Sequence, residues 1–190
     1  MAKAAKSDRE KRREKVIGVL NQARAMELHG ISQYMNQHYA LDNMDYGELA
    51  RDMKLIAIDE MRHAEQFAER IKELGGEPTT DPAAKVTKGQ DVRAIFPFDA
   101  DLEDNTIDVY NQFLKICQDC ADNQTAKLFE AIIEEEQAHF NHFDNVGNHI
   151  KTLGDTFLSK IAGTPATTGG PAKGFVLPGG LKLLVGRDMS

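Results

Sequence analysis

Two pairs of residues in this sequence have a spacing that suits metal binding. Glu60 and His63 are three residues apart, and so are Glu136 and His139. On an α-helix this spacing turns about 60° around the axis, so both side chains of a pair reach one centre. Carboxylate and imidazole ligands together suit iron or manganese, and zinc also binds them.

The spacings repeat in the two halves of the chain. A glutamate lies 33 residues before each pair, Glu27 in the first half and Glu103 in the second. A tyrosine follows each of these glutamates by seven residues, Tyr34 and Tyr110. The chain therefore looks like two copies of one helical hairpin. The four carboxylates together balance the charge of two divalent ions.

All four glutamates fall within apolar helical stripes, the positions that a helix bundle buries. Glu60 and His63, for example, share a face with Ile56 and Phe67. An unpaired buried carboxylate costs several kcal/mol, roughly, and no Lys or Arg recurs on all four faces. Taken singly, a Glu-x-x-His pair is usually solvated, and a lone Glu can mark the edge of a packing face. The repeated pattern favours a carboxylate-bridged dimetal site.

The elements that must position these residues are helices, because strand alternation is nearly absent. Asp45 and Glu48 predict a capping box before the second helix, and Phe96-Pro97 predicts a start of the third near Asp99. The predicted helices cover residues 9–39, 46–74, 99–121 and 123–153, with a short fifth at 155–163.

The connections predict an all-α four-helix bundle. Short links make the first two helices antiparallel, and likewise the third and fourth. Residues 75–98 allow a long crossover that makes helices two and three parallel. We expect one domain over residues 9–162, with flexible tails at 1–8 and 163–190, the latter rich in Pro and Gly.

Composition argues against a nucleic-acid-binding, membrane or secreted protein. The 190 residues contain 30 acidic and 23 basic side chains, for a net charge of −7, which argues against nucleic acid as a partner. No apolar run approaches the roughly 20 residues of a membrane helix, and the N-terminus lacks a secretory signal. The only cysteines, Cys117 and Cys120, form no zinc-ribbon or rubredoxin-like site. We expect a cytoplasmic protein with no membrane partner.

The six metal-site residues resemble the ferritin-like di-iron proteins, and Met61 makes the match closest to the bacterioferritin branch. The resemblance implies a ferroxidase that oxidises Fe(II) to Fe(III) with O2 or peroxide. It also implies a hollow 24-subunit cage, built from two-fold dimers, that stores a ferric mineral. The matching residues are Glu27, Glu60-Met-Arg-His63, Glu103 and Glu136-Gln-Ala-His139.

The resemblance also assigns roles around two iron ions per subunit. The ligands follow ion by ion: Glu27 and His63 for one iron, Glu103 and His139 for the other, and Glu60 and Glu136 bridging both. Tyr34 would stand beside the site as a hydrogen-bond partner or electron donor; its alternative role is that of a core aromatic.

Met61 lies about 100° around the helix from Glu60, so it should face away from the bundle core. In the family this surface forms a dimer interface where the thioethers of two subunits hold one iron porphyrin, haem b or a variant. Small or apolar neighbours should give it a smooth surface: Ala57, Ile58, Ala64 and Ala68. Without the resemblance, a helical Met is usually apolar packing.

One departure from the family concerns an accessory iron site on the inner wall of the cage. Some members carry a His five residues before the first bridging Glu, where this chain has Leu55. Asp59 and Glu135 remain as ligands that could touch iron there. The accessory site is therefore in doubt for this chain.

Two alternatives remain open. One is a rubrerythrin-like di-iron peroxidase without storage, which would be a dimer; that family usually carries a cysteine iron site that is missing here. The other is a non-catalytic haem electron carrier with a structural metal site. A ferredoxin-like or rubredoxin-like electron partner also fits the resemblance.

Overall fold

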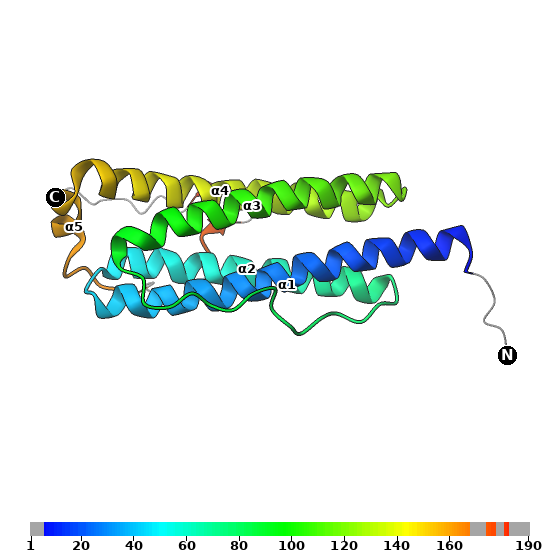
Figure 1. The fold of residues 1–190 in the computed structure, drawn as a ribbon, viewed down its shortest axis with the longest axis horizontal. Coiled ribbons are helices and arrows are strands. Elements are labelled where there is room, and N and C mark those ends of the chain that lie inside the picture. Colours follow the sequence, from blue (N-terminus) through cyan, green and yellow to red (C-terminus); the bar gives the residue numbers. More distant parts are fainter. Residues whose placement is uncertain (1–5, 168–173, 178–180, 183–190) are drawn as a thin grey trace.

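Five helices make up almost all of the computed structural model, which describes residues 6–167, 174–177 and 181–182 (Figure 1). Two short strands, β1 (Val176–Leu177) and β2 (Leu181–Lys182), pair antiparallel near the C-terminus. The predicted four-helix bundle with a short fifth helix is confirmed. The helices are α1 (Asp8–Asn43), α2 (Gly47–Glu73), α3 (Val92–Asp119), α4 (Asn123–Leu153) and α5 (Asp155–Ile161).

The bundle consists of two antiparallel hairpins, α1–α2 and α3–α4, joined by a crossover that runs back along α1 from the end of α2 to the start of α3 (Figure 1). Polar side chains of α1 hold this crossover in place. Arg24 Nε donates to the carbonyl of Thr79 at 2.9 Å, and Gln33 Nε2 donates to that of Thr87 at 3.0 Å. The crossover returns the chain to the end of the bundle at which α2 begins. Helices α2 and α3 therefore run parallel, as predicted.

The start of α2 differs from the sequence prediction. Its N-cap residue is Tyr46, which makes no side-chain capping bond, so the predicted Asp45–Glu48 capping box is wrong. Asp45 instead has φ 65° in the turn before the helix. The amide of Glu48 is bound by the Thr164 hydroxyl at 2.8 Å. A residue distant in sequence therefore replaces the local cap.

The third helix also begins earlier than predicted. Asp91 caps it by accepting bonds from the amides of Arg93 and Ala94, at 2.8 and 3.0 Å, so α3 starts at Val92 and Pro97 lies inside it. A proline in a helix removes one backbone hydrogen bond. Here the Asp cap and the buried residues on either side outweigh that loss, and the predicted start at Asp99 is wrong.

The apolar core is divided into two clusters, one toward each end of the bundle, and buried polar residues occupy the region between them. The cluster near α5 contains Leu41, Ile56, Phe96, Phe143 and Leu158 among others. The cluster at the opposite end contains Leu20, Phe67, Phe113 and Phe129 among others. Such a division of a bundle core requires the polar residues in the middle to be satisfied.

The C-terminal stretch returns to the bundle. Residues 174–177 lie against α2, although they belong to the stretch predicted as a flexible tail. Residues 1–5, 168–173, 178–180 and 183–190 are outside the described residues, so the two predicted tails stay predictions there. Among the described residues, no helix is long and apolar enough to span a membrane.

Candidate metal centre

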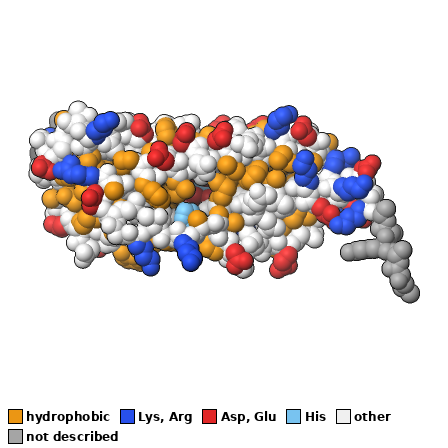
Figure 2. Space-filling model, in the orientation of Figure 1, with side chains coloured by type: hydrophobic (Ala, Val, Ile, Leu, Met, Phe, Trp, Pro, Cys, Tyr) orange, Lys and Arg blue, Asp and Glu red, His pale blue; other side chains and the backbone are white. Residues whose placement is uncertain are grey.

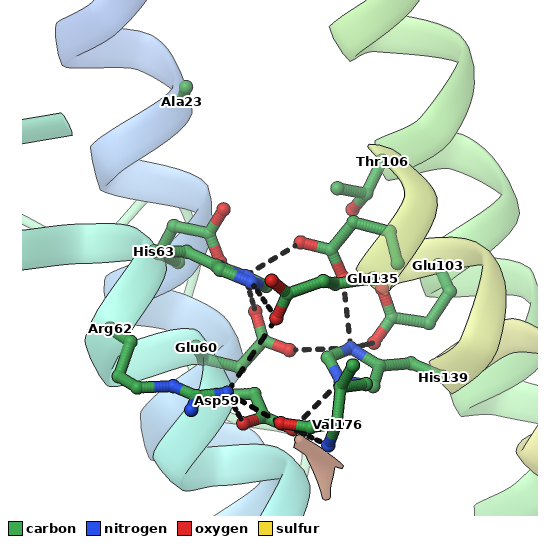
Figure 3. Close-up of polar contacts among 12 residues, drawn as sticks. Ala23, Asp59, Glu60, Arg62, His63, Glu103, Thr106, Glu135, His139 and Val176 are labelled. Atoms are coloured by element: carbon green, nitrogen blue, oxygen red, sulfur yellow. Dashed lines mark hydrogen bonds and ion pairs between the residues drawn. The ribbon is translucent and has the colours of Figure 1, made fainter. Parts of the chain in front are cut away.

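The middle of the bundle brings together the six residues singled out by spacing. Each of the four long helices contributes a Glu, and α2 and α4 each add a His (Figure 3). All six are buried, with at most 3% of any residue exposed to solvent. Four glutamates that are this close together and shielded from solvent require positive charge or protons to compensate them. They are Glu27, Glu60, His63, Glu103, Glu136 and His139.

These ligand atoms form two overlapping groups of four, each with all atoms within 4.8 Å of one another. One group includes Glu27 and His63, and the other includes Glu103 and His139. Glu60 and Glu136 belong to both groups. This geometry has the form of the predicted assignment, with two terminal pairs and two shared carboxylates. The individual roles remain predictions.

Both histidines direct Nδ1 toward the carboxylates. His63 Nδ1 lies 3.1 Å from Glu136 Oε1 and 3.7 Å from Glu27 Oε2. His139 Nδ1 lies 3.1 Å from Glu60 Oε1 and 3.0 Å from Glu136 Oε2. The same ring atom therefore faces the centre from α2 and from α4, which suits coordination of two ions by equivalent nitrogens.

The other ring nitrogen of each histidine faces a further carboxylate. His63 Nε2 is 3.2 Å from Glu135 Oε2, and His139 Nε2 is 3.3 Å from Asp59 Oδ2. When Nε2–H donates to a carboxylate, Nδ1 is left with the lone pair that a metal needs. The acidic residue just before each predicted bridging Glu thus orients the histidine of the opposite helix. The sequence pattern showed these residues but not this role.

Two tyrosines form hydrogen bonds with the glutamates of α1 and α3, each from the opposite helix. Tyr34 of α1 donates its hydroxyl to Glu103 Oε1 of α3, and Tyr110 of α3 donates its hydroxyl to Glu27 Oε1 of α1. The hydrogen-bond role expected for Tyr34 is thus seen in this structure, and Tyr110 provides its counterpart. The shared seven-residue spacing was the only sequence signal for Tyr110.

The metal-free centre holds protons in place of cations. Burial, together with the nearby carboxylates Glu60 and Glu136, raises the pKa of Glu27 well above its usual range. The same causes raise the pKa of Glu103. For His63, burial lowers the pKa, but the surrounding carboxylates outweigh burial and raise it. The centre therefore stays near neutrality by protonation.

His139 and Glu60 complete this arrangement. Burial lowers the pKa of His139, but hydrogen bonds with Asp59 and Glu136 raise it well above normal overall. Burial alone would raise the pKa of Glu60, but hydrogen bonds from Glu27, His139 and His63 outweigh burial, so the pKa lies below its usual range. Glu60 is thus the ionised carboxylate of the metal-free centre, and its protonated neighbours Glu27, His63 and His139 lie beside it.

The donor set fits divalent metal ions. Among the described buried polar atoms, Glu60 Oε1, His63 Nδ1 and Glu136 Oε1 have charged groups close by but make no hydrogen bond of good geometry. All three residues belong to the two overlapping groups of ligands, and Figure 3 shows Glu60 and His63 pointing toward the middle of the bundle. Buried polar atoms without a partner cost free energy unless an ion or water binds them. Mixed oxygen and nitrogen ligands are those that iron and manganese take.

A cavity of about 240 Å³ opens beside the centre on the side of α1 and α3, the face seen in Figure 2, where histidine and acidic atoms lie in a hollow near the middle. It is lined by Glu27, Glu60 and Glu103, with Tyr34 and His29 beside them. On the opposite side, between α2 and α4, the centre meets Asp59 and Glu135. The centre therefore has two distinct sides, and a cavity leads to the first.

Met61 lies on the outer face of α2 with half of its surface exposed. Ala57 and Ala64 are 1% and 3% exposed, so they do not form the smooth surface expected around it. Leu55 is buried and offers no metal ligand. Cys117 lies in an apolar cluster, and burial raises the pKa of its thiol to about 12, as expected for a packing residue.

Comparisons with known proteins agree with this geometry. Residues 17–162 match the model of the ferritin-like domain. A bacterioferritin of Desulfovibrio desulfuricans is 68% identical over 89% of this chain and 94% of its own length. A bacterioferritin of Mycolicibacterium paratuberculosis is 33% identical over 68% of this chain and 81% of its own.

A solved structure gives the same result for the fold. The crystal structure of the Desulfovibrio desulfuricans bacterioferritin, described as showing its diiron site in different catalytic states, is 67% identical to this chain. It superposes with a TM-score of 0.85, covering 90% of this chain and 100% of that one.

Proposed function

Because this chain belongs to the ferritin-like family, as a member of its bacterioferritin branch, we propose that its bundle is the ferroxidase unit of an iron-storage protein. The chain oxidises Fe(II) to Fe(III) and assembles into a homo-oligomeric cage that stores iron. The observation that carries this is the pair of overlapping four-ligand groups that share Glu60 and Glu136.

The ligands act as the resemblance assigns them. Glu27 and His63 would hold one Fe(II) and Glu103 and His139 the other, while Glu60 and Glu136, which belong to both groups of ligands, would serve both ions. The two Fe(II) supply two electrons, which with two protons reduce O2 to hydrogen peroxide, or peroxide to water. No external reductant is needed for this step.

The surrounding residues prepare the ligands for this reaction. Asp59 and Glu135 accept from Nε2 of the two histidines, which leaves Nδ1 free for metal. Tyr34 and Tyr110 donate to the terminal carboxylates and hold them in place. When metal binds, the protons of the metal-free centre leave. Burial excludes bulk water and strengthens each electrostatic contact.

The proposal is tested by adding two Fe(II) per chain without oxygen and then mixing with O2. We expect a fast rise in Fe(III) absorbance that saturates at about two Fe(II) per chain, the number of ligand groups. Glu136→Ala should abolish the fast phase, whereas Glu130→Ala, on the exposed side of the same helix, should not. Absence of Fe(II)-dependent oxidant consumption would favour the haem carrier instead.

Haem binding at Met61 and a 24-subunit cage are the finer parts of the proposal. Met61 is a large apolar side chain half exposed on α2, so its thioether is accessible to a porphyrin held between two subunits. With one thioether from each of two subunits, we expect one haem per two chains. Met61→Ala should lose most haem and keep Fe(II) oxidation. Met61→His should keep haem with a changed spectrum.

The mass of the purified assembly distinguishes storage from peroxidase function. About 24 subunits indicates a cage, whereas a dimer would indicate a rubrerythrin-like peroxidase. We also propose a cytoplasmic location, a domain over residues 9–162, and electron delivery by a ferredoxin-like or rubredoxin-like partner. The acidic net charge of −7 supports a surface that attracts cations.

A further inference from the structure

The C-terminal segment of residues 174–176, here called the C-terminal cover, closes the α2–α4 side of the metal centre. The amides of Phe175 and Val176 both donate to Asp59 Oδ2, each at 2.7 Å. Arg62 binds the Val176 carbonyl at 3.1 Å (Figure 3). The Phe175 ring stands edge-on to the His139 ring, with centroids 6.2 Å apart. The cover thus contacts a residue of the centre directly.

The cover and Arg62 donate hydrogen bonds to both carboxylate oxygens of Asp59. Oδ2 accepts both amides and faces His139 Nε2 at 3.3 Å, and Oδ1 accepts from Arg62. Asp59 is fully buried beneath these groups. A cation that bound Asp59 Oδ2 would have to displace backbone donors, because N–H groups and a cation compete for the same lone pairs. Docking of the cover and cation binding at Asp59 Oδ2 therefore compete with each other.

The cover closes only half of this side. Glu135, which supports His63 as Asp59 supports His139, keeps 31% of its side chain exposed. Among the described residues, its contacts come from His63 and Arg62, and none comes from the cover. The two halves of an otherwise symmetric centre therefore differ in access to the α2–α4 side.

Glycine at position 174 is required for this docking. Gly174 has φ +97°, a backbone conformation that L side chains rarely adopt. A Cβ built there would overlap Asp59 Oδ1 and lie 3.0 Å from an Arg62 nitrogen. A residue with a Cβ would force the segment or the Asp59 carboxylate to shift, so glycine at this position favours the docked state.

We propose that the C-terminal cover is a gate on iron leaving the centre past Asp59. This inference rests on the proposed ferroxidase function. Fe(II) reaches the centre from the cavity on the α1–α3 side, which the cover does not line. Release toward Asp59 requires the cover to detach, a local opening that exposes the side chains of Phe175 and Val176 and leaves the helices in place. Access and release are thus controlled on opposite sides of the bundle.

The test uses Gly174→Ala, a deletion of residues 174–190, and the matched control Gly89→Ala. Gly89 also has a positive φ, of +76°, but a Cβ there meets nothing within 4 Å. Hydrogen exchange of the Phe175 and Val176 amides, measured in the assembled metal-free protein, reports docking. We expect slow exchange in wild type and Gly89→Ala, and at least tenfold faster exchange in Gly174→Ala.

The rate of iron release is then measured with two successive additions of Fe(II), each of two ions per chain. The amplitude of the first oxidation reports the ferroxidase centre itself and should be the same in all variants. The waiting time after which the second addition regains that amplitude reports release. We expect this time to shorten at least threefold in Gly174→Ala and in the deletion, and to remain unchanged in Gly89→Ala.

The outcomes separate the two proposals. A missing first oxidation in wild type refutes the ferroxidase function. A normal first oxidation with equal recovery times in wild type and the deletion refutes the gate. Unprotected Phe175 and Val176 amides in wild type refute it as well, because the cover would then not be docked.

Discussion

Loading the centre with two divalent ions should expel about four protons per chain at neutral pH. Glu27, Glu103, His63 and His139 all have a pKa raised by burial or by neighbouring carboxylates. Each of these groups must lose its proton to become a ligand. The four protons of the metal-free centre therefore compete with the metal ions.

The size of the effect follows from this count of groups. Each proton released changes the binding free energy by about 1.4 kcal/mol per pH unit. For four protons, binding of the two ions together should strengthen by about 5 kcal/mol per unit as pH rises. The dependence flattens once the metal-free centre loses its protons at higher pH.

Calorimetry with Zn(II) in two buffers of different ionisation enthalpy measures the number of protons released. Zn(II) is suitable because it undergoes no redox reaction. Glu27→Gln removes one titrating ligand and should lower the number by about one, whereas the exposed-site variant Glu130→Gln should leave it unchanged. Release of fewer than two protons in wild type, or no change in Glu27→Gln, would contradict this account of the metal-free centre.

Three further outcomes follow. Glu60→Ala and Glu136→Ala should each abolish fast Fe(II) oxidation in stopped-flow traces and keep a helical circular-dichroism spectrum; wild-type speed in either would rule out bridging. Metal-loaded protein should melt higher than metal-free protein, since binding adds RT ln(1 + [L]/Kd) to stability; equal calorimetric melting temperatures would count against a shared inner site. Tyr110→Phe should weaken Zn(II) binding by about 1 kcal/mol through loss of the bond to Glu27, and an unchanged affinity would show that the bond does not support metal binding.

The metal-free protein should also lose stability as pH rises, opposite to the trend in metal binding. The raised pKa values mean that the folded state holds more protons than the unfolded chain. Their contribution is complete below the unfolded values, about 4.3 for Glu and about 6.5 for His, and is lost as pH rises through the folded values. Thermal melts of metal-free protein between pH 6 and 9 measure this, and a rise of melting temperature across that range would contradict it.

The sequence was sufficient for the bundle and for the grouping of the six central residues, because these rest on local periodicity. Helix α4 has the predicted bounds, Asn123–Leu153. Glu136 and His139 share one face of it, so their convergence needs only the helical repeat. The 33-residue repeat then predicted that the second hairpin meets the first around the same point.

The two errors at helix starts have different causes. Thr164, far along the chain, accepts from the amide of Glu48, and so replaces the cap that Asp45 was expected to supply. At α3 the missed residue is a local one, because Asp91 accepts from the amides of Arg93 and Ala94 and so begins the helix ahead of Pro97. Neither contact has a periodic signal. The cross-helix roles of Asp59 and Glu135 were missed for the same reason, since each supports a histidine on the other hairpin.

The centre combines an internal symmetry with one element that breaks it. Two similar hairpins place equivalent ligands, tyrosines and supporting carboxylates around two ions, so the hairpins alone would make the two positions nearly alike. Phe175 and Val176 have no counterpart in the first hairpin, and they bind only the Asp59 half. The cavity on the α1–α3 side and the carboxylates on the α2–α4 side already give a path for iron two different ends, but two equivalent metal positions would release iron in the same way. The segment that breaks the symmetry is therefore where a difference between taking up and releasing iron can arise.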